Sequence, residues 1–435
     1  MNNSTIYQQR RVELAKLICA KTGGGIAIIT TAPETSRNRD SEFPYRHDSD
    51  FFYLTGFEEP GATLVLKTSG SASQAQLESH LFCRPKDAER EIWDGIRLGP
   101  DAAPLALGVE YAHSNHELDK KLGELLADQD AVYIRLSESA ETDRRLRHWM
   151  KQVRAQARAG VNPPSEFHDV ESLIHEMRLF KDAHEIDIMR RAAAISARAH
   201  VRAMQACKPG MREYHLEAEL LHEFRYSGAQ SVAYNSIVAG GANSCILHYR
   251  AGDTELRSGE LCLIDAGCEL DGYASDITRT FPVNGKFTGP QRALMQPHEA
   301  ALKVLTQGLL DEKLLKLSEL GSLDNAIETG AYRRFYMHRT SHWLGMDVHD
   351  VGSYREPLST STDSSEKPWR LLKPGMVLTI EPGLYIRPAD DVDKRFWNIG
   401  IRIEDDAVVN DYGCELISRG VPVKADEIEA LMKNN

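Results

Sequence analysis

The segment LCLIDAGCELDGYASDITRTF, residues 261–281, constrains the fold more than any other part of the chain. It predicts a β-hairpin, because Asp271-Gly272 is a preferred dipeptide for a two-residue turn and apolar residues flank it on both sides. A turn at these residues pairs Asp265 with Thr278. Asp276 then lies diagonal to Asp265 on the same face of the hairpin. A turn centred one residue earlier would place the two aspartates directly opposite each other.

In either register two carboxylates share one face of the hairpin, where their mutual repulsion is destabilising. Each aspartate lies in an apolar strand, and an unpaired buried carboxylate is costly. A cation held between Asp265 and Asp276 removes this conflict. The alternative is that one of them is an ordinary surface aspartate near the turn, and the pair alone leaves both interpretations open.

Two strand-like segments further along the chain add two inward-facing glutamates. In VLTIEPGLYI, Glu381 shares a face with Val377 and Thr379. In IGIRIEDDAVV, Glu404 shares a face with Arg402. A glutamate at the end of an apolar strand is hard to explain as a solvated side chain. The alternative for Glu381 is a salt bridge to a core arginine such as Arg402.

Between the hairpin and these strands lies MHRTSHWLGMDVHDVG, which contains His338, His342 and His349. A single histidine is more often a hydrogen-bonded core residue than a ligand, but three within twelve positions favour a site. Four carboxylates and one imidazole form an oxygen-rich set that suits two divalent ions. Two such ions activate water and stabilise a tetrahedral intermediate, so these residues predict a hydrolase.

Composition and charge limit the other possibilities. The 435 residues, 42% hydrophobic and 27% charged, predict a globular protein of two or three domains. The net charge of −12 argues against nucleic-acid binding. No apolar run approaches the roughly 20 residues that span a membrane, and the N-terminus lacks the apolar core of a secretion signal. Seven cysteines without a CxxC pair favour reduced thiols and a cytoplasmic location.

The chain is expected to form two domains. In the first third, strand-like runs at 25–31, 62–67 and 131–136 alternate with helical stretches, which predicts an N-terminal α/β domain over residues 1–175. A polar, Pro-containing stretch at 152–164 is the expected hinge. Residues 176–435 begin with two helices, one capped by Asp182 and ending before Cys207, the other over 213–226. Strands follow, so this domain is expected to be α+β, with helices on a curved, largely antiparallel sheet.

Taken together, these motifs resemble the pita-bread metallopeptidases, and within them the aminopeptidase P group of Xaa-Pro aminopeptidases. The resemblance covers nearly the whole chain. In the first domain it rests on DSEFPYRHDSDFFYLTGFEEPGATLVL and AEREIWDGIRLG. In the second it rests on HEMRLFK, CILHY, LIDAGCELDGYASDITRTFPVNGKF, SHWLGMDVHDVG, VLTIEPGLYI and IGIRIEDD.

The resemblance implies a set of metal ligands. Asp265 would bind one ion, Asp276 and Glu404 would bridge both ions, and His342 and Glu381 would complete the other site. The family's metal is usually manganese (Mn²⁺), although these ligand types also permit cobalt, zinc or iron.

The resemblance also implies a mechanism. A metal-bridging hydroxide would attack the carbonyl of the bond before proline, and Glu381 would carry the proton to the leaving nitrogen. His349 and His248, the latter from CILHY, would hydrogen-bond the developing oxyanion. The alternative for His248 is core packing.

His338, Tyr385 and Arg402 would line the proline pocket. Tyr385 could instead be an ordinary cross-strand aromatic, and Arg402 could serve only to neutralise the carboxylates.

The expected function is therefore an aminopeptidase that acts on peptides with proline at the second position, as a homo-oligomer (dimer or tetramer). One alternative is a prolidase, which uses the same ligands but cleaves only dipeptides. An alternative of another class is a non-enzymatic pita-bread protein that binds peptides. One departure stands out: after Phe287 the family usually continues with a long helix and a Pro-Gly turn, and here a helix-length segment after Met295 is absent.

Overall fold

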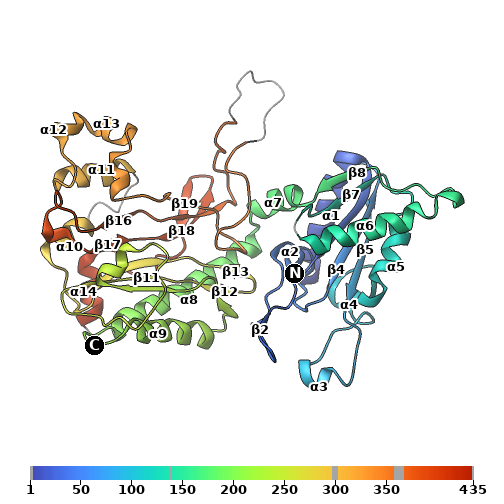
Figure 1. Cartoon of the computed structure of the whole chain (residues 1–435), viewed down its shortest axis with the longest axis horizontal. Helices are drawn as coiled ribbons and strands as arrows, with labels where there is room; N and C mark the ends of the chain where they lie inside the picture. The colour runs from blue at the N-terminus through green and yellow to red at the C-terminus, as the bar shows by residue number, and fades with distance from the viewer. Residues whose placement is uncertain (1–2, 138, 296–301, 357–366, 434–435) are drawn as a thin grey trace. The chain divides into compact units, whose positions relative to one another are not determined.

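The computed structural model describes residues 3–137, 139–295, 302–356 and 367–433. The chain forms two compact units, Met1–Arg178 and Leu179–Asn435, which are described separately (Figure 1). The stretch expected to be a hinge, 152–164, lies inside the first unit. The reason is that strand β8, Glu166–Asp169, follows this stretch and adds to the sheet of the first unit beside β7, Ala131–Ile134.

The first unit is built around one mixed sheet of six strands in the order β6-β5-β4-β1-β7-β8. Its central strand β1 pairs antiparallel with β4 and parallel with β7. The three strands expected from sequence are β1, β4 and β7, with ends shifted by at most two residues. The elements are α1 (Asn3–Thr22), β1 (Gly24–Thr30), β2 (Ser36–Asn38), β3 (Ser41–Glu42), α2 (Ser49–Thr55), β4 (Thr63–Ser69), β5 (Gln76–Cys83), α3 (Glu91–Asp94), α4 (Ala103–Leu107), β6 (Tyr111–Ser114), α5 (Leu118–Leu125), β7, α6 (Ala140–Arg154), β8 and α7 (Glu171–Leu179).

The second unit opens with two long helices that begin and end as the sequence predicts. Asp182 caps α8 (Ala183–Ala206): its carboxylate accepts the Glu185 N–H at 2.9 Å, and the Glu185 carboxylate accepts the Asp182 N–H at 3.0 Å. The second helix, α9, spans Glu213–Tyr226. The two helices pack side by side against the strands, α8 on β12 and β13 and α9 on β10 (Figure 1).

The strands of the second unit form small antiparallel sheets, ordered β10-β11-β14, β13-β12-β9, β15-β18-β19 and β16-β17. This confirms the expected α+β architecture of helices on antiparallel strands. The elements after α9 are β9 (Ser231–Val232), β10 (Ile237–Gly240), β11 (Leu261–Asp265), β12 (Cys268–Leu270), β13 (Tyr273–Ala274), β14 (Thr278–Pro282), α10 (Gly289–Met295), α11 (Leu302–Asp311), α12 (Leu317–Leu320), α13 (Leu323–Glu328), β15 (Val377–Ile380), β16 (Gly383–Ile386), β17 (Ile399–Arg402), β18 (Asp405–Asn410), β19 (Gly413–Leu416) and α14 (Ala425–Lys433).

The predicted hairpin is present in the register set by the Asp-Gly turn. Asp271 and Gly272 have φ values of 49° and 80°, as a two-residue hairpin turn requires. Asp265 pairs with Thr278, as predicted, where β11 meets β14. The residues nearer the turn pair as β12 with β13, which belong to a second small sheet. The backbones approach closely between these sheets, because a Cβ added to Gly267 would lie 1.7 Å from the carbonyl oxygen of Ser275.

Three remaining expectations concern the segment after Met295, membrane-spanning helices and the cysteines. The region directly after Met295, where a helix-length segment is absent, falls at 296–301, which lies outside the described residues. Among the described residues, every helix is too short or too polar to cross the hydrocarbon layer of a bilayer. The seven cysteines are unpaired, and six of them are buried.

Candidate active site

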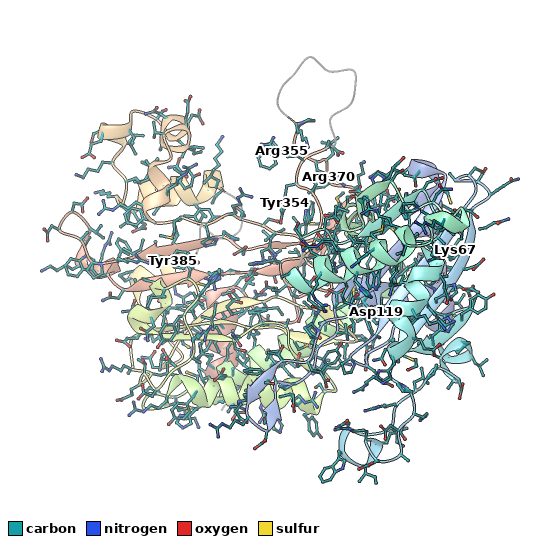
Figure 2. The ribbon with its side chains drawn as sticks, turned by 45° about the vertical axis from the view of Figure 1, so that its right-hand side comes forward. Lys67, Asp119, Tyr354, Arg355, Arg370 and Tyr385 are labelled. Carbon is teal, nitrogen blue, oxygen red and sulfur yellow. The ribbon has the colours of Figure 1, made fainter. Side chains whose placement is uncertain are left out.

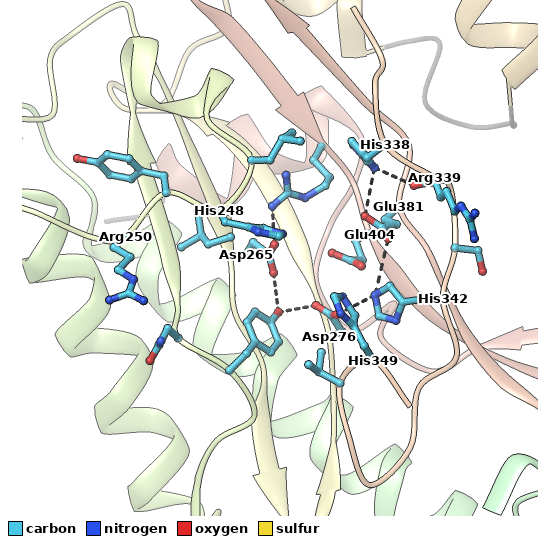
Figure 3. A pocket seen from close by; sticks show the side chains of 18 of the residues that line it. His248, Arg250, Asp265, Asp276, His338, Arg339, His342, His349, Glu381 and Glu404 are labelled. Atoms are coloured by element: carbon cyan, nitrogen blue, oxygen red, sulfur yellow. Dashed lines mark hydrogen bonds and ion pairs between the residues drawn. The ribbon is translucent and has the colours of Figure 1, made fainter. Parts of the chain in front are cut away.

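A cavity of about 620 Å³ in the second unit collects most of the residues singled out by the sequence (Figure 3). All five predicted ligands line it, so side chains up to 139 positions apart in the chain (404 − 265) meet in one place. The same cavity is lined by three further histidines and an arginine that the sequence singled out. The full set is Asp265, Asp276, His342, Glu381 and Glu404, together with His248, His338, His349 and Arg402.

The hairpin and a later strand hold the acidic residues together. Asp265 is the last residue of β11, and Asp276 lies just before β14. Thr278 connects them to Glu404: its hydroxyl donates to Glu404 Oε2 at 2.7 Å, and its carbonyl accepts the Glu404 N–H at 3.0 Å. The backbone pairing of Thr278 with Glu404 therefore holds the Glu404 carboxylate beside those of the hairpin.

The tightest group in the cavity is formed by Asp276, His342 and Glu404, whose ligand atoms all lie within 4.8 Å of one another. His342 Nε2 is 3.5 Å from Asp276 Oδ2 and 3.7 Å from Glu381 Oε1 (Figure 3). The other ring nitrogen, Nδ1, lies 2.9 Å from the carbonyl oxygen of Trp343, to which it donates. This hydrogen bond leaves Nε2 as the nitrogen that faces the carboxylates, the usual arrangement of a metal-binding histidine.

Tyr234 links the two aspartates and was not found by the sequence analysis. Its hydroxyl lies 2.6 Å from Asp265 Oδ1 and 2.5 Å from Asp276 Oδ1, which confirms that both carboxylates share one face of the hairpin. The hydroxyl has one proton and so donates to one carboxylate at a time. A tyrosine 31 residues before Asp265 (265 − 234) gives no spacing signal that sequence reasoning could use.

The electrostatics of the cavity favour bound cations. Burial raises the pKa of Asp276, and the charge of Asp265 adds to that effect. Burial also raises the pKa of Glu381 to about 7, although nearby His342 opposes the shift. The pKa of Glu404 is raised well above its usual range, again mainly by burial. Several buried carboxylates thus crowd one cavity, and two divalent ions fit this donor set because they would neutralise it.

Arg402 pairs with Asp265, not with Glu381. Its Nη2 forms an ion pair with Asp265 Oδ2, and its Nε donates to the Thr278 hydroxyl at 3.0 Å. The salt bridge from Glu381 to Arg402, which the sequence left open, is therefore not the contact formed in the described site. The residues that lie close to Glu381 are His338, at 3.5 Å, and His342.

Behind the cavity wall, a short hydrogen-bond chain links Arg402 to His338. Arg402 Nη1 donates to the Tyr385 hydroxyl at 2.9 Å, and this hydroxyl lies 2.9 Å from His338 Nε2. His338 Nδ1 donates to the Arg339 carbonyl at 2.8 Å. Burial lowers the pKa of His338 to about 4, so its ring is neutral. Tyr385 is 1% exposed and is not among the lining residues; it lies within the strands (Figure 2) and orients the side chains in front of it.

The two predicted oxyanion donors face the cavity from different segments. The exposed ring of His349 meets that of His342 edge-on, with centroids 4.3 Å apart. His248 is also exposed and lies beside Asp265, on the wall opposite His338 and His342 (Figure 3). Tyr354 lines the cavity near His342, and its ring stacks on that of Trp343 with centroids 5.2 Å apart (Figure 2).

A second acidic and histidine-containing group lies in the first unit and has a different explanation. Asp50, Glu171 and His175 bring ligand atoms within 4.8 Å of one another. However, Arg135 Nη2 and Arg178 Nη1 lie 2.7 and 2.6 Å from the Asp50 carboxylate. These two guanidinium groups neutralise the carboxylate, so the group is an ion-pair network.

Comparisons with known proteins agree on both units. The model of metallopeptidase family M24 matches residues 187–411, and that of the aminopeptidase P N-terminal domain matches residues 7–133. The chain is 46% identical to the Xaa-Pro aminopeptidase of Escherichia coli, covering 98% of this chain and 97% of that protein. It is 40% identical to the Xaa-Pro aminopeptidase of Haemophilus influenzae, covering 92% and 91%.

Solved structures give the same result. An aminopeptidase from Pseudomonas aeruginosa superposes with a TM-score of 0.91 at 46% identity, covering 99% of this chain and 98% of that one. A variant of Escherichia coli aminopeptidase P in complex with substrate superposes with a TM-score of 0.90 at 44% identity, with the same coverage.

Proposed function

Because the chain belongs to metallopeptidase family M24, we propose that it removes the N-terminal residue from peptides whose second residue is proline, with the cavity residues in the roles given below. It is a metal-dependent Xaa-Pro aminopeptidase with the aminopeptidase P N-terminal domain. The observation that carries the assignment of roles is the meeting of five candidate ligands in one cavity. All five positions hold side chains that bind divalent ions, which argues against a peptide-binding relative without activity.

We assign two divalent ions, with manganese as the metal, to Asp265, Asp276, His342, Glu381 and Glu404. Such ions activate water for attack at neutral pH and neutralise negative charge on the substrate. The support is the donor set: four carboxylates, and an imidazole whose Nε2 faces them. Tyr234, Thr278 and Arg402 each contact one or two of these carboxylates and hold their orientation.

Glu381 is assigned the proton transfer to the nitrogen that leaves with proline. Its carboxylate lies at the cavity wall between His338 and His342, which places a proton carrier beside the reacting groups. His349 and His248 approach from different segments and are assigned as hydrogen-bond donors to the carbonyl oxygen as it becomes negative.

The proline ring is assigned to the surface formed by His338 and Arg402, with Tyr385 behind them. The hydrogen-bond chain from Arg402 through Tyr385 to His338 supports this assignment, because it fixes both lining side chains in one orientation. A rigid wall suits a rigid ring, since little side-chain entropy is then lost when the substrate binds.

We also propose a homo-oligomer in the cytoplasm. Support for the oligomer comes from α3 and the residues after it, where Ile92, Trp93 and Ile96 are each at least 80% exposed. Exposed apolar groups of this kind mark surfaces that bind protein. The seven unpaired cysteines support a reducing compartment.

The decisive experiment measures release of the first residue from Arg-Pro-Pro and from an Xaa-Pro dipeptide, with added Mn²⁺ and after chelation. We expect metal-dependent cleavage of the tripeptide. Replacement of Glu381 by Ala should lower kcat by about a hundredfold or more, as loss of a general acid–base group does. The matched control, Glu415→Gln, changes a surface glutamate paired with Arg190 and should leave kcat unchanged.

Each other outcome has a definite meaning. Cleavage confined to the dipeptide would identify a prolidase instead. A purified protein that binds no divalent ion and cleaves neither peptide would support the peptide-binding alternative. Unchanged hydrolysis by the Glu381→Ala variant would refute the role given to Glu381.

A further inference from the structure

The first residue of α9, Glu213, is a fully buried carboxylate that pairs with no cationic side chain in the described part of the chain. Four hydrogen-bond donors surround it instead. Oε1 accepts from the Gly240 N–H at 2.9 Å and from Asn243 Nδ2 at 3.0 Å. Oε2 accepts from the Tyr249 hydroxyl at 2.9 Å and from the Gly252 N–H at 3.1 Å. All four donors belong to one segment, residues 240–252.

This segment forms one wall of the active-site cavity through Leu247, His248, Tyr249 and Arg250. His248 is exposed, and its ring makes no hydrogen bond to any residue that the structure describes. The position of the imidazole therefore depends on the backbone that carries it. Its next neighbour in the chain, Tyr249, is tied directly to Glu213.

The way α9 begins adds to this attachment. The Glu213 N–H donates to the Thr254 carbonyl at 3.2 Å, and the Tyr214 N–H donates to the Gly252 carbonyl at 3.2 Å. The Glu213 carboxylate thus holds the segment on both sides of His248, and the helix backbone adds two bonds on the C-terminal side. Four hydrogen bonds from one segment to a single buried side chain make Glu213 an effective anchor here.

We propose that Glu213 is a positioning residue for the hydrolysis, which fixes the 240–252 segment so that the His248 imidazole meets the carbonyl oxygen of the substrate. The inference rests on the proposed function and deepens it, because it explains how a histidine whose ring bonds to none of the described residues is held in place. Glu213 is not among the residues that line the cavity, and its carboxylate bonds to none of the five candidate ligands.

The test begins with Glu213→Gln. The amide keeps the size of the side chain, but its nitrogen does not accept hydrogen bonds, so two of the four donors lose their acceptor. We expect the kcat of the metal-loaded enzyme on an Xaa-Pro tripeptide to fall about tenfold or more, since a misplaced oxyanion donor has effects of that order. The KM should stay within about twofold. Metal content should not change. The matched control is Glu217→Gln on the same helix, which should keep the wild-type kcat because its side chain forms no hydrogen bond to the described residues.

A double-mutant cycle separates positioning from general stabilisation. If Glu213 acts through His248, then Glu213→Gln lowers kcat by less than about twofold in a His248→Ala background. Equal losses in both backgrounds would overturn the inference, as would a wild-type kcat for Glu213→Gln. A His248→Ala variant with full activity would refute the role of His248 and so that part of the proposed function. A wild-type kcat for Glu213→Gln alone would refute only the positioning role of Glu213.

Tyr249→Phe keeps the test decisive if Glu213→Gln does not fold. This variant removes one donor of the four and leaves the carboxylate in place. We expect a smaller fall in kcat, again absent when His248 is already Ala. A fall of the same size in both backgrounds would count against the proposal.

Discussion

The hydroxyl of Tyr234 lies between the carboxylates of Asp265 and Asp276. These two groups repel each other when no metal is bound, but they must lie close together to bind one. Without bound ions, the Tyr234 hydroxyl, which donates to one of them at a time, reduces that repulsion. With ions bound, the same hydroxyl would donate to one of the two carboxylates and keep that side chain in the rotamer that faces the cavity. Tyr234 therefore has the place of an outer partner that orients metal ligands.

We predict that Tyr234→Phe weakens binding of Mn²⁺ by roughly ten- to hundredfold, the usual effect of removing an outer partner of a metal ligand. Isothermal titration calorimetry on the metal-free protein measures the affinity. Tyr226→Phe is the matched control, because Tyr226 is 82% exposed and outside the cavity. An affinity equal to that of the wild type would show that the carboxylates are oriented without this hydroxyl.

At the scale of single elements, the hairpin of β11 to β14 depends on one close backbone approach. Gly267 has no room for a side chain, since a Cβ there would lie 1.7 Å from the Ser275 carbonyl oxygen. The chain segments around Gly267 and Ser275 would have to separate to admit a methyl group. Asp265 and Asp276, which line the cavity, lie in these same segments.

We predict that Gly267→Ala lowers the free energy of unfolding by about 2 kcal/mol or more, in the range of substitutions that force a packed backbone to move. Urea denaturation followed by circular dichroism measures this value. Gly289→Ala is the control: no atom lies within 4 Å of its Cβ position, so a change within about 0.5 kcal/mol is expected. Equal midpoints for the two variants would contradict the prediction.

The parts of this architecture that sequence reasoning predicted depend on short-range rules. The hairpin register follows from the Asp-Gly turn and the two-residue period of strands, and the start of α8 follows from the Asp182 capping box. The faces of Glu381 and Glu404 follow from the same period. The ligand roles came from family resemblance, because nothing in the spacing alone says which carboxylates meet.

Long-range contacts lay outside that reasoning. The Glu404–Thr278 bonds and the pairing of Arg402 with Asp265 join segments more than a hundred residues apart, and only the fold decides which of several acidic partners an arginine meets. The misplaced hinge at 152–164 has a related cause. A polar, Pro-containing stretch marks a surface loop, but it does not tell whether the next strand returns to the same sheet.

At the scale of the whole molecule, the exposed apolar residues around α3 predict self-association. Ile92, Trp93 and Ile96 are 80%, 81% and 85% exposed. Burying side chains of this size on association would contribute about 1.5–3 kcal/mol each.

We predict that the double variant Trp93→Ser, Ile96→Ser shifts the protein to a smaller species than the wild type in size-exclusion chromatography with light scattering. The matched control, Tyr412→Ser, changes a fully exposed aromatic residue in the second unit and should elute as the wild type does. A wild-type protein that is already monomeric at micromolar concentration would refute the predicted assembly.

The distribution of the candidate ligands along the chain has a consequence for biosynthesis. Asp265 and Glu404 are separated by 139 residues (404 − 265), and they meet only when strands from both regions have formed. A ribosome that has made the hairpin has therefore produced only part of the centre, and no partial translation product that stops short of Glu404 holds the full donor set.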